Sequence, residues 1–143
     1  MNLTFSLYLL PIFIAIYLWF KLKIPIKKAI ALVLLPPFLF TLPFVISNGL
    51  KGFLVFLFGI AFTFVALLYY ALIVLYLLKR YKLGYFKLFL VGGVVGYIVG
   101  FINFAILQEG KNSISSYASA AIIPMITGAI SIVLVEFISK KIK

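Results

Sequence analysis

The composition of this 143-residue chain excludes a soluble globular domain. Hydrophobic residues make up 66% of the sequence and charged residues only 10%, whereas soluble proteins carry about 25% charged residues. The net charge of +11 does not indicate nucleic-acid binding, because the cations stand in short clusters between apolar runs and form no continuous basic face. The sequence therefore predicts an all-α, polytopic integral membrane protein that forms a single domain over residues 1–143.

The first predicted membrane span covers residues 3–20, about eighteen residues, which is long enough to cross a bilayer as a helix. Its end, Tyr17 to Phe20, is rich in aromatic residues and is followed by Lys21, as expected at a membrane interface. A cleavable signal peptide would need a basic start and a small-residue cleavage site. Neither is present, so we expect a permanent span with its N-terminus outside, followed by a surface turn over residues 21–28.

The second predicted span, residues 29–47, is interrupted by Pro36, Pro37 and Pro43. Each proline removes a backbone donor, and in lipid the freed carbonyls need protein or water partners, so this helix should pack against its neighbours. A re-entrant loop is the alternative. It would place the two four-cation loops on opposite sides of the membrane, and a kinked full span is therefore favoured.

The third predicted span, residues 53–78, is the longest apolar run of the chain. It exceeds the thickness of a bilayer, about 30 Å, and should tilt or project beyond the interface. Tyr69, Tyr70 and Tyr76 gather in its second half, either as packing residues or along a path for a solute, since ring faces attract cations. A loop with four cations follows: Lys79, Arg80, Lys82 and Lys87.

The fourth predicted span, residues 88–107, carries Gly92, Gly96 and Gly100 on one helical face. Glycine at this spacing, a glycine zipper, lets a second helix approach closely, and close packing drives helix association in lipid. Asn103 lies one turn further along nearly the same face. We expect its amide to hydrogen-bond to a partner helix.

The fifth predicted span, residues 117–138, follows a polar loop in which the charges of Glu109 and Lys111 cancel. Ala120, Pro124 and Gly128 recur every four residues and form the natural partner for the glycine face of the fourth span. The hydroxyl residues Ser119, Thr127 and Ser131 are expected to form hydrogen bonds between helices, or else to face a solute.

The positions of the cations predict the orientation. Eleven of the thirteen Lys and Arg residues fall in three clusters, at 21–28, 79–87 and 140–143. The positive-inside rule places such clusters in the cytoplasm, which gives five spans with the N-terminus outside and the C-terminus cytoplasmic. The clusters should also attract anionic lipids, and the short loops favour a prokaryotic plasma membrane.

The residue types needed for catalysis are mostly missing. The chain has no cysteine and no histidine, which removes thiolate chemistry and the commonest general base and metal ligand. We therefore expect no enzyme, no cofactor and no metal site. Glu136 is an acidic residue within an apolar run, and it is either an interfacial ion-pair partner of Lys140 or a proton- or cation-coupling site.

Interrupted helices are where small transporters hold their substrates. The candidate residues for a solute path or for coupling are Glu136, Asn103, Thr127, Ser131 and Pro124. These features predict a small carrier, a flippase-like protein or a pore or transport subunit for a neutral or lipidic solute, working as a homo-oligomer or within a larger membrane complex. The alternative is a non-transporting accessory or immunity-type protein that acts through helix packing. Convergence of the candidate polar residues on one cavity would favour transport, and their dispersal would favour the alternative.

Overall fold

The computed structural model describes residues 3–108 and 111–141, and within these ranges all side chains except those of residues 3–8 and Phe62. Glu109 and Lys143 lie outside the described residues. The described chain forms helices α1 (Leu3–Lys21), α2 (Ile26–Asn48), α3 (Leu50–Arg80), α4 (Tyr85–Leu107), α5 (Ile114–Ala120) and α6 (Ile122–Lys141). The predicted all-α fold is confirmed.

Four helical segments of the described chain are long and apolar enough to cross a membrane: Ile26–Asn48, Thr63–Arg80, Tyr85–Leu107 and Ile114–Lys141. α1 and the first part of α3 are apolar helices as well. These segments are compatible with a multi-pass membrane protein. A fifth crossing would require α1.

The helices extend beyond the predicted spans into the basic loops. α2 begins three residues early, at Ile26, because Pro25 takes the extended conformation that precedes a helix start. α3 continues to Arg80 and α4 begins at Tyr85. Lysine and arginine are good helix formers, so the helices continue into the basic loops. The ends of the spans predicted from hydropathy therefore fall inside the helices.

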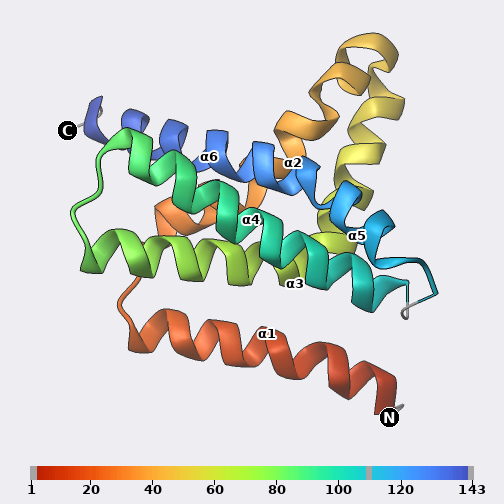
Figure 1. Cartoon of the computed structure of the whole chain (residues 1–143), viewed down its shortest axis with the longest axis horizontal. Helices are drawn as coiled ribbons and strands as arrows, with labels where there is room; N and C mark the ends of the chain where they lie inside the picture. The colour runs from red at the N-terminus through yellow and green to blue at the C-terminus, as the bar shows by residue number, and fades with distance from the viewer. Residues whose placement is uncertain (1–2, 109–110, 142–143) are drawn as a thin grey trace.

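The helices form an elongated bundle from which one hairpin projects (Figure 1). α1, the second half of α3, α4 and α6 run side by side along the long axis of the molecule. The most extensive interhelix contacts join α4 with α6 and α2 with α3, whereas α1 packs mainly on α3. Large side chains at the centre of the bundle are fully buried: Leu32, Leu75, Leu88 and Ile132.

The projecting hairpin consists of residues 37–62, which we call the arm. α2 and α3 both turn away from the bundle axis at its base (Figure 1). In α2 the bend follows Pro36 and Pro37, and in α3 it lies near Gly59, whose carbonyl accepts a hydrogen bond from the Thr63 hydroxyl at 2.6 Å. Proline and back-bonded hydroxyl residues both bend helices.

The two halves of the arm pack closely at its tip. A Cβ added to Gly52 would overlap the carbonyl of Phe44 and the Cα of Val45, so a glycine is needed there for the chains to approach. Phe38 and Phe56 meet edge to face, with ring centroids 6.0 Å apart. As expected for the third span, α3 is one continuous helix, Leu50–Arg80, and it bends near Gly59 (Figure 1).

The predicted fifth span is divided into two helices. α5 begins at Ile114, where the Ser113 hydroxyl accepts a hydrogen bond from the Ser116 N–H at 3.4 Å, and the chain turns at Ala121 before α6. Pro124 causes the break, because it has no N–H to donate to the Ala120 carbonyl. The span therefore starts before residue 117 and is interrupted near its beginning.

The described basic residues of the three clusters gather at one end of the bundle, which we call the cationic end. The Lys79 ammonium donates to the carbonyl oxygen of Leu22 at 2.8 Å, and this contact joins the end of α3 to the turn after α1. Lys140 lies over the Tyr85 ring, 4.9 Å from its centroid, and joins α6 to the start of α4. The arm projects from the half of the bundle away from this end (Figure 1).

Candidate functional site

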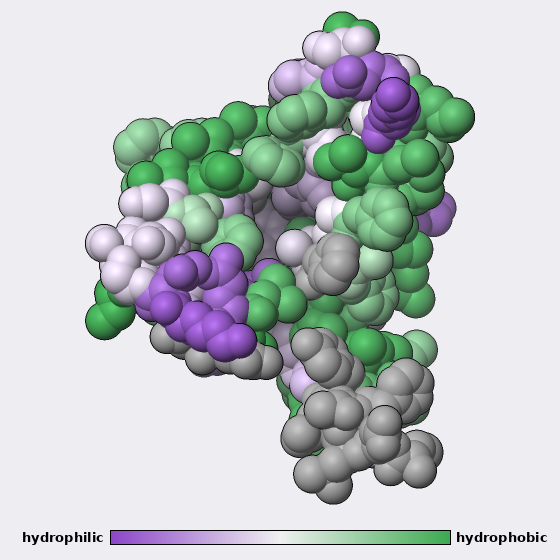
Figure 2. All heavy atoms as spheres, turned by 90° about the vertical axis from the view of Figure 1, so that its right-hand side faces the viewer, coloured by the Kyte–Doolittle hydropathy of each residue, from purple (hydrophilic) through white to green (hydrophobic). Residues whose placement is uncertain are grey.

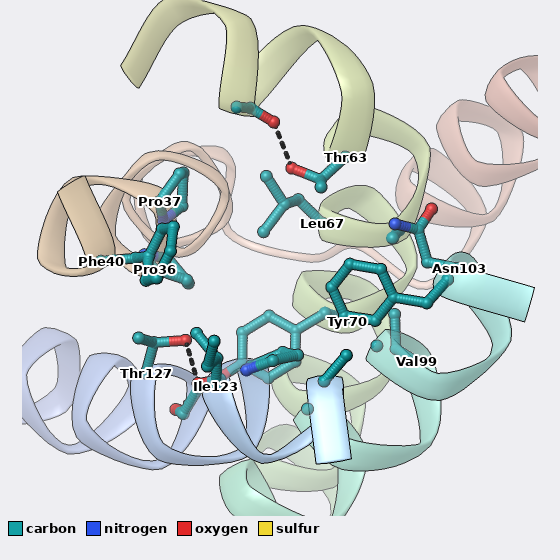
Figure 3. Close-up of a pocket in the computed structure, with 18 of the residues that line it drawn as sticks. Pro36, Pro37, Phe40, Thr63, Leu67, Tyr70, Val99, Asn103, Ile123 and Thr127 are labelled. Atoms are coloured by element: carbon teal, nitrogen blue, oxygen red, sulfur yellow. Dashed lines mark hydrogen bonds between the residues drawn. The ribbon is translucent and has the colours of Figure 1, made fainter. Parts of the chain in front are cut away.

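A cavity of about 480 Å³ lies in the angle between the arm and the bundle, and is open on one side. Its wall comes from α2, α3, α4, α5 and α6. Figure 2, which views the molecule from the right-hand side of Figure 1, shows a hollow below the arm within a mainly apolar surface. The close-up in Figure 3 shows Pro36, Pro37 and Phe40 on one side of the cavity and Ile123 and Thr127 on another.

The glycine face of α4 forms one wall, where it packs on α6. A Cβ added to Gly96 would overlap the carbonyl oxygen of Pro124, and one added to Gly100 would overlap the Pro124 ring. At Gly92 it would lie 2.9 Å from the Gly128 carbonyl oxygen. Any larger side chain at these three positions would therefore push α4 away from α6.

Tyr70 closes the floor of the cavity by linking α3 to α6. Its hydroxyl donates to the carbonyl oxygen of Gly128 at 2.5 Å, and its side chain is buried. Tyr69, next to it, donates to the carbonyl oxygen of Pro11 on α1 at 3.0 Å. These two tyrosines thus hold the bundle together, and Tyr70 also lines the cavity.

The hydroxyl groups of the candidate residues bond within their own helices. Thr127 donates to the Ile123 carbonyl at 3.0 Å, Ser131 to the Thr127 carbonyl at 2.5 Å, and Ser119 to the Ser115 carbonyl at 2.9 Å. The predicted hydrogen bonds between helices are therefore wrong for these three residues. A carbonyl four residues earlier is within reach of any helical serine or threonine, and it competes successfully with a partner across the bundle.

Asn103 lines the cavity and is partly exposed. The expected hydrogen bond to a partner helix is not formed, since among the described residues no group bonds to the Asn103 side chain. The helix opposite the glycine face of α4 is broken at Ala121, between α5 and α6. Next to Asn103 it presents the Pro124 ring, which packs against Gly100. In Figure 3 the amide points away from α4 at the edge of the cavity.

Glu136 and Ser131 do not line the cavity. Glu136 is 8% exposed at the cationic end, where its Oε2 lies 2.9 Å from the Lys28 ammonium and its Oε1 lies 3.6 Å from that of Lys140. Ser131 is fully buried. Of the five candidates, the structure brings together Asn103, Pro124 and Thr127 at the cavity, together with the packing residues Gly96, Gly100, Ala120 and Gly128.

Several residues of the cavity were not singled out from the sequence. Thr41, Gly59 and Thr63 line it because α2 and α3 turn away from the bundle axis there. Tyr70, which was expected either to pack or to lie along a solute path, lines it as well. The prolines signalled the bend in α2. Gly59 with Thr63 four residues later was the corresponding signal in α3, although this pair is weak evidence by itself.

None of the described residues that line the cavity carries a charged side chain. Within the described residues there is also no group of three acidic, histidine or cysteine side chains that could hold a metal ion. The site can therefore accept an apolar body together with a few uncharged polar atoms. Comparisons of the chain with protein-family models, curated proteins and solved structures find no match.

Proposed function

We propose that this protein binds a neutral, lipidic solute in the cavity between the arm and the bundle and helps it to move between the leaflets of the membrane. In this role it is a small carrier, a flippase-like protein or a transport subunit, with no catalytic step. The observation that carries the proposal is the cavity itself. Its volume of about 480 Å³ lies within the 300–1,000 Å³ typical of small-molecule sites, and its apolar wall with a few polar groups is typical of them.

The proposed topology has five crossings, with the N-terminus outside and the C-terminus in the cytoplasm of a prokaryotic cell. Support comes from the cationic end, because the turn after α1, the loop between α3 and α4 and the end of α6 all meet there. Cations at the cytoplasmic face would bind anionic lipid headgroups. The arm and the cavity would then lie toward the outer leaflet, from which a lipid chain could enter.

A cavity-filling variant tests this proposal. Gly59 lines the cavity, and a Cβ added there meets nothing within 4 Å, so Gly59→Leu should occupy the cavity without displacing a helix. Gly84→Leu is the matched control, since Gly84 has equal space and lies outside the cavity. The measurement is the flipping of fluorescent glucosylceramide, an uncharged lipid, in proteoliposomes with an impermeant quencher added outside.

We expect the original protein and Gly84→Leu to accelerate flipping over protein-free liposomes, and Gly59→Leu to reduce the accelerated rate at least fivefold. Equal rates for the two leucine variants would show that the cavity is not the path. No acceleration by the original protein would contradict the carrier role.

The second candidate function is that of an accessory or immunity-type protein that packs against a partner in the membrane. The arm favours it, because large apolar side chains along the arm are exposed: Phe40, Phe44, Ile46, Phe53 and Phe58. A homo-oligomer or a larger complex could cover them. If flipping is absent, a cross-linkable residue at Phe44 that captures a defined partner in native membranes would support this second function.

A further inference from the structure

We infer that the polar end of the bound solute is an uncharged hydroxyl group, which hydrogen-bonds to the side-chain amide of Asn103. This assignment rests on the proposed function, since it requires a solute in the cavity. It adds the chemical class of that solute, namely a long-chain lipid alcohol.

Asn103 differs from the other polar side chains of the cavity wall because its hydrogen-bonding groups are uncommitted among the described residues. The Thr41 hydroxyl donates to the Pro37 carbonyl at 2.8 Å. Thr63 and Thr127 likewise donate to their own helices, and Tyr70 donates to Gly128. Each of these groups has already used its proton within the protein.

Asn103 is partly exposed, so its uncommitted amide is open to a ligand in the cavity. A ligand hydroxyl satisfies this amide well. The asparagine amide offers both an acceptor oxygen and two donor hydrogens, and a hydroxyl can donate to the oxygen or accept from the nitrogen. The contact would therefore add one hydrogen bond to the apolar contacts that the cavity wall makes with the solute.

The position of Asn103 along α4 suits the end of an amphiphile. It lies about one turn before Leu107, the last residue of α4, at the end of the helix remote from the cationic end. A hydroxyl there would sit near the membrane interface while the hydrocarbon chain extends past Gly59 toward Tyr70. Because the cavity lining has no cation, an ionised carboxylate or phosphate would find no charged partner at this point.

A cycle of two ligands and two proteins tests the inference. The ligands are radiolabelled 1-hexadecanol and hexadecane, which differ by one hydroxyl, and the proteins are the original chain and Asn103→Leu in detergent micelles. The change in the alcohol-to-alkane affinity ratio between the two proteins isolates the contact, because the partitioning of each ligand into micelles cancels. Asn48→Leu is the matched control, since Asn48 is exposed at the tip of the arm.

We expect the ratio to fall about three- to tenfold in Asn103→Leu, the effect of one hydrogen bond, with hexadecane affinity retained and Asn48→Leu unchanged. Retained hexadecane binding also shows that the variant is folded. A ratio that is equal in all three proteins would overturn the role of Asn103. Gly59→Leu distinguishes this failure from a failure of the proposed function. If Gly59→Leu binds neither ligand, both ligands bind in the cavity. If it binds both ligands as the original protein does, the cavity is not their binding site and the proposed function fails.

Discussion

Glu136 shows how a single carboxylate can hold together helices that are distant in sequence. It is nearly buried and lies between two ammonium groups, that of Lys28 on α2 at 2.9 Å and that of Lys140 on its own helix at 3.6 Å. Lys28 is the better-shielded partner, with a side chain 27% exposed against 56% for Lys140. The contact between α2 and α6 should therefore contribute more stability than the contact within α6.

Replacing Glu136 with glutamine should lower the thermal unfolding midpoint of the protein in detergent. We expect a cost of about 1–2 kcal/mol, because the change leaves the part-buried Lys28 without its charge partner. Lys140→Gln, which breaks the exposed pair and the contact of Lys140 with the Tyr85 ring, should cost less, about 0.5–1 kcal/mol. A similar loss in both variants would contradict the stronger role of Lys28.

The same variant separates two roles of Glu136. As a purely structural residue it should leave the flipping rate unchanged at temperatures where the variant stays folded. A loss of flipping with no change in the unfolding midpoint would instead support proton or cation coupling at Glu136.

The sequence could show only half of this arrangement. Glu136 and Lys140 are four residues apart, so their proximity follows from helix geometry alone. Lys28 is separated from Glu136 by 108 residues, and no local pattern reports such a contact. Asn103 was misjudged for a related reason, since the expected partner was a helix whose path is altered by the break at Ala121.

At the scale of helices, the contact between α4 and α6 depends on glycine. Gly96→Ala should be destabilising by about 1–3 kcal/mol, because the new methyl group would overlap the backbone carbonyl of Pro124, which no rotamer change can move. Gly59→Ala is the matched control. It makes the same change in open space within a helix and should be neutral or stabilising by about 0.5–1 kcal/mol.

Unfolding in detergent, followed by circular dichroism, measures both variants. If Gly96→Ala were as stable as Gly59→Ala, the close approach of α4 to α6 would not be a determinant of the fold.

The contact between α4 and α6 was more accessible to prediction than the arm. The four-residue repeats of small residues in both segments directly identify the faces that can approach each other. To predict the arm, one would have to predict a bend in α2 and a second bend in α3 beside it. The prolines mark only the first of these, whereas the second lies within a continuous apolar run whose length suggests one long helix.

The whole molecule places its cationic clusters at one end, and this arrangement makes its topology testable. Because the chain has no cysteine, single variants Lys23→Cys, Lys82→Cys and Asn112→Cys can each carry the only reactive thiol. A membrane-impermeant maleimide added to intact cells should label Asn112→Cys and leave the other two unlabelled until the membrane is opened. Labelling of Lys23→Cys and Lys82→Cys from opposite sides would contradict the arrangement of five crossings.

The ion pair between Lys28 and Glu136 also has a consequence for biogenesis. The ribosome synthesises α2 long before α6. The Lys28 ammonium therefore has no Glu136 carboxylate to pair with until more than a hundred further residues have been made. During that time α2 can pack on α3, but its contact with α6 cannot form. Assembly of the bundle would thus be completed only when the last helix arrives, which makes this protein sensitive to interrupted translation or to loss of its final helix.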